Sequence, residues 1–154
     1  MDPELGVQSV TVLVQKEVAV RMTSEPGSKD YGALTLLIAL HGQAALRLSV
    51  PHQAFLPPPK VDSAVVRIEM PSRIALSGEE RQQVNAVIRR IFQQRRKMMA
   101  RTLQAATGAP IGEIREALQQ EGIQGSARPE QVSLEQLVHI LQRIGYINGR
   151  NRIE

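Results

Sequence analysis

A short run of basic residues provides the side chains best suited to bind a polyanion. Between positions 81 and 112 the chain has seven Lys or Arg residues and no Asp or Glu, although its net charge is only +4. A local positive field of this kind favours polyanionic partners such as nucleic acids. The candidate phosphate contacts are Arg89, Arg90, Arg95, Arg96, Lys97 and Arg101.

Five of these six residues form two rows on a helical projection. Arg89 and Arg96 make up one row, and Arg90, Lys97 and Arg101 make up the second. If several of them contact phosphates, binding weakens steeply with salt because counterions are released. The alternative is a solvated helix surface with glutamines between the charges.

Three consecutive prolines mark a second candidate site. Pro57, Pro58 and Pro59 have fixed φ angles and lack amide donors, so this stretch is predicted to be a stiff extended loop outside any sheet ladder. Such a loop holds Phe55 and Lys60 in set positions. Phe55 could anchor the loop to the core, and Lys60 could reach a phosphate or be solvated.

Several other chemistries are disfavoured. The chain has no Cys, and His41, His52 and His139 lie far apart without ligand-like spacing, which argues against a zinc site. Asp62 and Ser63 have no His or second carboxylate at a useful spacing, so we interpret them as hydrogen-bonding residues that fix the start of a strand. The N-terminal residues lack signal-peptide features, and no apolar run approaches the ~20 residues of a membrane span, so we expect a cytoplasmic protein without membrane contact.

The residue pattern predicts strands only in the first half. A β-branched run from Val10 to Val14 is typical of a strand covered on both faces, and a helix is expected over 15–22. Residues 45–50 alternate like an edge strand, and 61–70 are apolar on both faces like an interior strand. The simplest sheet has 61–70 in the middle.

Helices alone are expected after Pro71. Ser77 with Glu80 and Ser133 with Gln136 form capping boxes at two helix starts. A break is expected near Gln93 and Gln94, because an unbroken helix would place Arg95 on the apolar face beside Val84 and Ile88. The expected class is thus α/β, with about three strands in a mixed sheet, followed by a small all-α part.

Five stretches resemble, in order and approximate spacing, the C-terminal half of the small-subunit rRNA adenine dimethyltransferases of the KsgA type. They cover residues 14–19, 26–32, 55–67, 92–97 and 128–133, and the Pro-Lys-Val-Asp-Ser string at 59–63 is the most specific. The resemblance implies a remnant of a Rossmann-like methyltransferase domain over 1–72 and a helical RNA-contacting domain over 73–154. It further implies small-subunit rRNA or the ribosomal subunit as partner, and dimethylation of two adjacent adenines with S-adenosylmethionine.

By this resemblance Phe55 matches the aromatic residue beside the flipped target adenine. Two other family features are absent from the sequence: it contains no Gly-x-Gly turn for the cofactor and no Asn-Leu-Pro-Tyr type loop for the amine. We therefore expect no bound S-adenosylmethionine and no catalytic residue in this chain alone, and hence binding of rRNA without methyl transfer.

The missing part of the family's sheet would leave the edge of the 10–14 strand unpaired. We expect self-association or a separate N-terminal half to cover this edge. Two alternative functions stay open: a non-catalytic helix-turn-helix-like module with its turn at Gln93 and Gln94, and a self-associating structural fragment.

Overall fold

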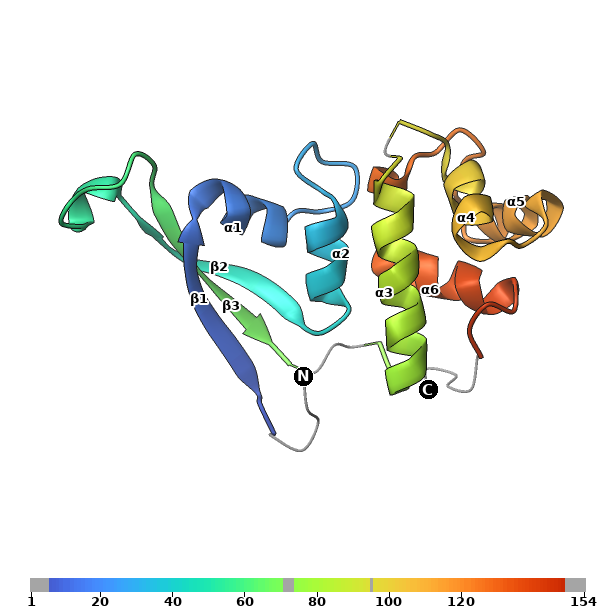
Figure 1. The fold of residues 1–154 in the computed structure, drawn as a ribbon, viewed down its shortest axis with the longest axis horizontal. Coiled ribbons are helices and arrows are strands. Elements are labelled where there is room, and N and C mark those ends of the chain that lie inside the picture. Colours follow the sequence, from blue (N-terminus) through green and yellow to red (C-terminus); the bar gives the residue numbers. More distant parts are fainter. Residues whose placement is uncertain (1–5, 71–73, 95, 149–154) are drawn as a thin grey trace.

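The structure is a computed structural model that describes residues 6–70, 74–94 and 96–148, and it places a small sheet beside a group of helices (Figure 1). The first part contains β1 (Ser9–Gln15), α1 (Lys16–Met22), α2 (Ala33–Ala39), β2 (Gln43–Val50) and β3 (Ser63–Glu69), with a 3-10 turn at His52–Ala54. The second part contains α3 (Gly78–Phe92), α4 (Met99–Thr107), α5 (Ile111–Gln120) and α6 (Leu134–Arg143), with a 3-10 turn at Pro129–Gln131. Among the described residues, each helix is too short or too polar to cross a bilayer.

The strand order confirms the predicted sheet, with β3 between β1 and β2. Val66 at the centre of β3 pairs with Val12 on one side and with Leu46 on the other. Both ladders are antiparallel, so the predicted mixed sheet is wrong for these strands. The reason is that β1 and β2 run in the same direction but never touch, because the reversed strand β3 separates them.

Only one face of β1 is covered in the described chain. Val12 and Val14 pack with Ala64 and Val66 beneath the first helices, whereas Leu13 on the opposite face is 54% exposed. The prediction that both faces of this strand are buried is therefore wrong, because the helices that follow β1 cover a single side (Figure 1).

Gly42 sets how closely the turn before β2 approaches β3. A Cβ atom at this position would lie 2.3 Å from the Glu69 carbonyl oxygen and 2.9 Å from a methyl carbon of Ile68. Real Cβ atoms do not approach backbone oxygen this closely. The glycine is therefore required by space.

The main core runs across the predicted boundary between the two parts. Tyr31, Leu36 and Leu40 belong to the same buried cluster as the apolar stripes of α3 to α6. Arg81 of α3 also donates a hydrogen bond to the Leu40 carbonyl. The division at residue 72 stays a prediction, since residues 71–73 lie outside the described range.

The predicted helix starts and the predicted break are confirmed. Ser77 Oγ accepts from the Glu80 amide at 3.2 Å while the Glu80 carboxylate accepts from the Ser77 amide at 2.8 Å, and Ser133 and Gln136 form the same pair of bonds. α3 ends at Phe92, and α4 begins at Met99. The polar segment between them carries part of the basic cluster.

Candidate nucleic-acid interface

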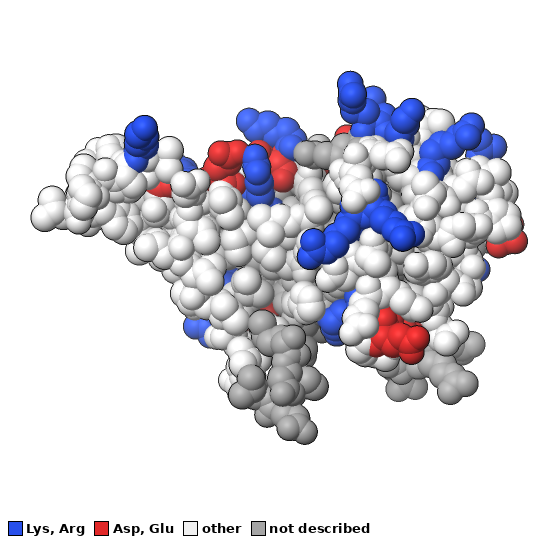
Figure 2. All heavy atoms as spheres, viewed as in Figure 1, with Lys and Arg blue, Asp and Glu red and all other residues white. Residues whose placement is uncertain are grey.

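Five of the six predicted basic residues lie within the described chain, all of them exposed. Arg89 and Arg90 lie in the last turn of α3, Arg96 and Lys97 in the connection to α4, and Arg101 near the start of α4. We call these five residues the basic face; Arg95 lies outside the described residues. Figure 2 shows Lys and Arg side chains gathered over this side of the helical part.

The two rows expected from a single helical projection are not formed. Because α3 ends at Phe92, Arg96 and Lys97 leave the helix axis and Arg101 belongs to a second helix. The break therefore spreads the charges over two helix ends and a connection, which is a broader surface than one helix would provide.

The charges of the basic face are not neutralised within the described residues. Arg21, Arg47, Arg67 and Arg143 each have a carboxylate oxygen within 4.0 Å, whereas none of the five basic-face residues forms such a pair among the described residues. Unpaired exposed cations keep their full attraction for an external anion.

Two members of the basic face also have structural contacts. The Arg90 guanidinium donates to the Ala106 carbonyl at 3.1 Å and so connects α3 to α4. Arg89 Nε donates to the Asn85 side-chain oxygen at 2.9 Å on its own helix. Each guanidinium has five N–H donors, so both retain free donors for a phosphate.

The N-terminal end of α4 adds a positive helix terminus to this surface. Unlike α3 and α6, α4 begins without a side-chain cap, and its first turn contains no acidic residue. Its first amide, on Met99, donates to the Ala127 carbonyl at 2.7 Å. Helix N-termini favour anions because they are the positive end of the helix dipole. The N-terminal end of α4 therefore adds to the positive charge of Lys97 and Arg101 beside it.

Phe55 and Lys60 lie elsewhere, in the loop between β2 and β3. This loop projects from the end of the sheet that points away from α3 to α6 (Figure 1). Phe55 is half-buried and Lys60 is exposed. The structure therefore does not bring the proline loop together with the basic face, and the candidate site consists of two separate surfaces.

Asp62 closes the base of the proline loop. One of its carboxylate oxygens accepts from the His52 amide at 3.0 Å and lies 2.9 Å from His52 Nδ1. The side-chain hydrogen bond from His52, followed by the backbone one, lowers the pKa of the Asp62 carboxyl. The predicted role of Asp62 in fixing the loop is thus confirmed.

The prediction that no histidine accompanies Asp62 is wrong, because the loop folds back and brings positions 52 and 62 together. Sequence reasoning missed His52 as a functional residue. The only available signal was its place five positions before the first residue of the proline run.

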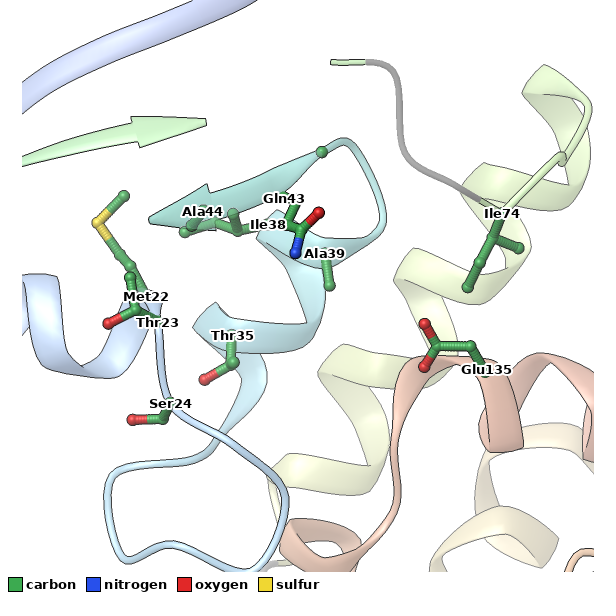
Figure 3. Close-up of a pocket in the computed structure, with 11 residues that line it drawn as sticks. Met22, Thr23, Ser24, Thr35, Ile38, Ala39, Gln43, Ala44, Ile74 and Glu135 are labelled. Carbon is green, nitrogen blue, oxygen red and sulfur yellow. The ribbon is translucent and has the colours of Figure 1, made fainter. Parts of the chain in front are cut away.

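A cavity of about 230 Å³ separates α2 and the start of β2 from residues Ile74 and Glu135 (Figure 3). The Thr35 hydroxyl on its wall is already used, since it donates to the Arg21 carbonyl at 2.6 Å and accepts from the Gly32 amide at 3.2 Å. The hydroxyls of Thr23 and Ser24 on the same wall likewise donate to backbone carbonyls. Across residues 6–70, 74–94 and 96–148, no three His, Asp or Glu side chains gather as metal ligands would.

Comparison with known protein families shows which family the chain belongs to. The sequence profile described as Ribosomal RNA adenine dimethylase matches residues 2–145 of this chain. The chain belongs to this family. Members of the family transfer methyl groups from S-adenosylmethionine.

Two curated relatives of this chain carry the name Ribosomal RNA small subunit methyltransferase A. The protein from Lactobacillus delbrueckii subsp. bulgaricus is 38% identical over 149 residues, which cover 96% of this chain and 49% of the relative. The protein from Acidobacterium capsulatum is 38% identical over 134 residues, which cover 87% and 47%. The chain thus spans about half the length of these relatives.

Solved structures of two methyltransferases share the fold of this chain. A dimethyladenosine transferase from Plasmodium falciparum matches with a TM-score of 0.70 at 19% identity, over 90% of this chain and 57% of that structure. The 23S rRNA methyltransferase ErmE matches with a TM-score of 0.68 at 24% identity, over 90% and 55%. This similarity supports the α/β fold of the chain.

The turn between β1 and α1 lacks the features of a nucleotide-cofactor turn. A nucleotide cofactor needs a glycine-rich turn where a strand passes into a helix, with free amides facing the ligand. β1 passes directly into α1 without a glycine, and the first helical amide, on Lys16, donates to the Asp62 carbonyl at 2.9 Å. That turn is already filled by protein contacts.

Proposed function

We propose that this chain is the RNA-contacting, C-terminal part of a small-subunit rRNA adenine dimethyltransferase, and that it binds the rRNA backbone through its basic face. The observation that carries the proposal is the charge pattern. Four arginines elsewhere on the described surface are paired with carboxylates, whereas the five cations of the basic face are unpaired, lie close together in the sequence and adjoin an uncapped helix start. Phosphate is the anion that RNA presents along its whole length.

The proline loop supplies the second proposed contact. In the complete enzyme Phe55 stacks on the target adenine, an interaction worth about 1–3 kcal/mol, and Lys60 contacts a nearby phosphate. The methyl donor and the groups that hold the amine come from the other half of the enzyme. By this proposal the chain alone binds rRNA and does not transfer methyl groups.

The unpaired edge of β1 is the proposed joint with that other half. Within the described residues β1 is paired only with β3, and no charged residue or proline interrupts Ser9–Gln15. The apolar side chains Leu13, Val65 and Leu48 lie in register across the open face of the sheet. We propose that a strand of the N-terminal half pairs here, because the chain spans about half the length of its relatives.

Sedimentation of the chain with and without a separately expressed N-terminal half of a relative tests this joint. A one-to-one complex that Leu13→Lys, a charge on the exposed face of the edge strand, abolishes supports it. Self-association that persists when the partner half is added in excess contradicts it.

A salt titration of binding tests the RNA proposal. The probes are a hairpin from the 3′ end of small-subunit rRNA and a random DNA duplex, each titrated from about 50 to 200 mM salt. We expect the hairpin to bind more tightly at every salt concentration. Equal affinity for the two nucleic acids would refute the rRNA assignment.

Charge-removing variants locate the surface. The triple variant Arg89→Gln, Arg96→Gln, Arg101→Gln leaves the Arg90 bridge intact and is expected to reduce the slope of log K against log salt by about 2 to 3, at 0.7–0.9 per lost phosphate contact. The matched control removes the same charge from paired residues, as Arg21→Gln, Arg47→Gln, Arg67→Gln. A slope that falls equally in both variants would show that only net charge matters.

The helix-turn-helix alternative makes a different prediction in the same titration. In that motif the turn has about 3–4 residues, whereas residues 93–98 separate α3 from α4 in this chain. This spacing favours the rRNA proposal. Preferential binding to duplex DNA would instead support the helix-turn-helix module.

A further inference from the structure

The tip of the proline loop is the most exposed apolar segment of the described chain. Leu56 is 98% exposed, and the five residues that follow it, Pro57 to Val61, are exposed as well. Lys60 is the only charged side chain among them. A contiguous apolar tip of this kind is unusual on a protein surface and marks an interaction site.

The tip is held in place at its base. Asp62 bonds to both the amide and the ring of His52, and its carbonyl accepts from Lys16 at the start of α1. Inside the loop the Phe55 amide donates to the His52 carbonyl at 3.3 Å, and the prolines fix their own φ angles. A preordered loop loses little conformational freedom on binding, so its apolar side chains can enter a partner as a rigid element.

An RNA whose bases are stacked is the partner that fits this tip best. Proteins that unstack bases insert apolar side chains such as Leu or Pro between them, and an enzyme that modifies a base must first take it out of the stack. Leu56 adjoins Phe55, the proposed stacking residue, and the Lys60 cation lies on the same loop for the adjoining phosphate. A docking site for a protein would not require a cation and a stacking ring on the same short loop.

We propose that Leu56 is a wedge: it enters the base stack of the rRNA beside the target adenines and occupies the space that the flipped base leaves, while Phe55 receives that base. The inference rests on the proposed rRNA-binding function. It assigns Leu56 a positioning role for the reaction and involves no chemical step.

The experiment measures unstacking separately from binding. The probe is the same rRNA hairpin with 2-aminopurine at one of the two adjacent adenines, since this base fluoresces more strongly when it leaves the stack. We expect the wild-type chain to raise the fluorescence, and Leu56→Ser to remove most of the rise and weaken binding about tenfold, equivalent to about 1.4 kcal/mol. Leu56→Met keeps an apolar wedge and should restore the signal.

The controls separate a wedge from a general effect. Leu34→Ser removes an exposed leucine from α2, where the residue is 39% exposed, and should leave both readouts unchanged. The salt slope should be the same for Leu56→Ser as for the wild type, because no charge is lost. Thermal melting should also match, because the Leu56 side chain is in solvent.

The outcomes distinguish the two proposals. If the basic-face variant weakens binding while Leu56→Ser keeps the full fluorescence rise, the wedge is refuted and the rRNA-binding function stands. If the hairpin does not bind, or binds no better than duplex DNA, both are refuted. If a separately supplied N-terminal half protects residues 56–61 from solvent in the absence of RNA, the tip is a protein contact and the wedge is refuted.

Discussion

Removing the hydroxyl of Tyr31 should lower the stability of the folded chain, because this hydroxyl links the segment before α2 to the helical part. Tyr31 is 3% exposed, and its hydroxyl donates to the Val132 carbonyl at 2.8 Å, across 101 positions of sequence. Tyr31→Phe removes this bond and leaves a buried carbonyl without that donor. A lost buried hydrogen bond of this kind costs about 1–2 kcal/mol, and each kcal/mol lowers the melting temperature of a domain of this size by about 2–4 °C.

The same residue gives the prediction a pH signature. Burial, and then the nearby Glu135 charge, raise the pKa of Tyr31 above its ordinary value near 10. Above pH 10 the unfolded chain therefore loses the phenolic proton while the folded chain keeps it, and stability falls as pH rises. The fall is up to about 1.4 kcal/mol per pH unit between the unfolded and folded pKa values.

Denaturant unfolding followed by far-UV circular dichroism at pH 8 and pH 10.5 checks both effects. The matched control is Tyr146→Phe, which removes the same atom from the other tyrosine of the chain. We expect Tyr31→Phe to be less stable than the wild type at pH 8 and to lose less stability between the two pH values. Equal stability at pH 8 together with an unchanged alkaline fall would refute the reasoning.

Three further predictions concern local structure. Gly42→Ala should cost about 1–3 kcal/mol by overpacking, because the new methyl meets the Glu69 carbonyl; Gly112→Ala, which meets nothing within 4 Å, is the control in the same thermal melts. Asp62→Ala should abolish the hydrogen-exchange protection of the His52 amide at pH 6. In the wild type the pKa of Asp62 is lowered, so this protection should fade only as the pH falls below the ordinary Asp range. Full protection in the variant would contradict the role of the hydrogen bond from the His52 amide to Asp62. Ser77→Ala should lower stability by about 0.5–2 kcal/mol through loss of the cap, whereas an unchanged melting curve would show that the α3 capping box contributes nothing.

Local signals in the sequence predicted much of this structure. The capping boxes at Ser77 and Ser133 join residues three positions apart, so their bonds depend only on neighbouring sequence. The prolines constrain their own backbone in the same way. The order of the strands could be predicted because β3 has apolar residues on both faces, which is typical of a central strand.

Long-range contacts could not be predicted in this way. The bonds between His52 and Asp62 and between Tyr31 and Val132 depend on how distant segments fold back, and neither has a spacing rule. The exposure of Leu13 depends on which helices cover the sheet, which the strand's own residues do not specify. For the same reason the sequence predicted the basic cluster but not its separation from the proline loop.

The core that α2 shares with α3 to α6 bears on how this protein could be divided. Tyr31, Leu36 and Leu40 are buried against the helical part, although they precede it by more than thirty positions. If the gene were split at residue 72, the helical product would lose the apolar residues that bury its core. The other product would expose Tyr31, Leu36 and Leu40 to solvent. The smallest autonomous helical unit should therefore start upstream of Tyr31, with part of the sheet included.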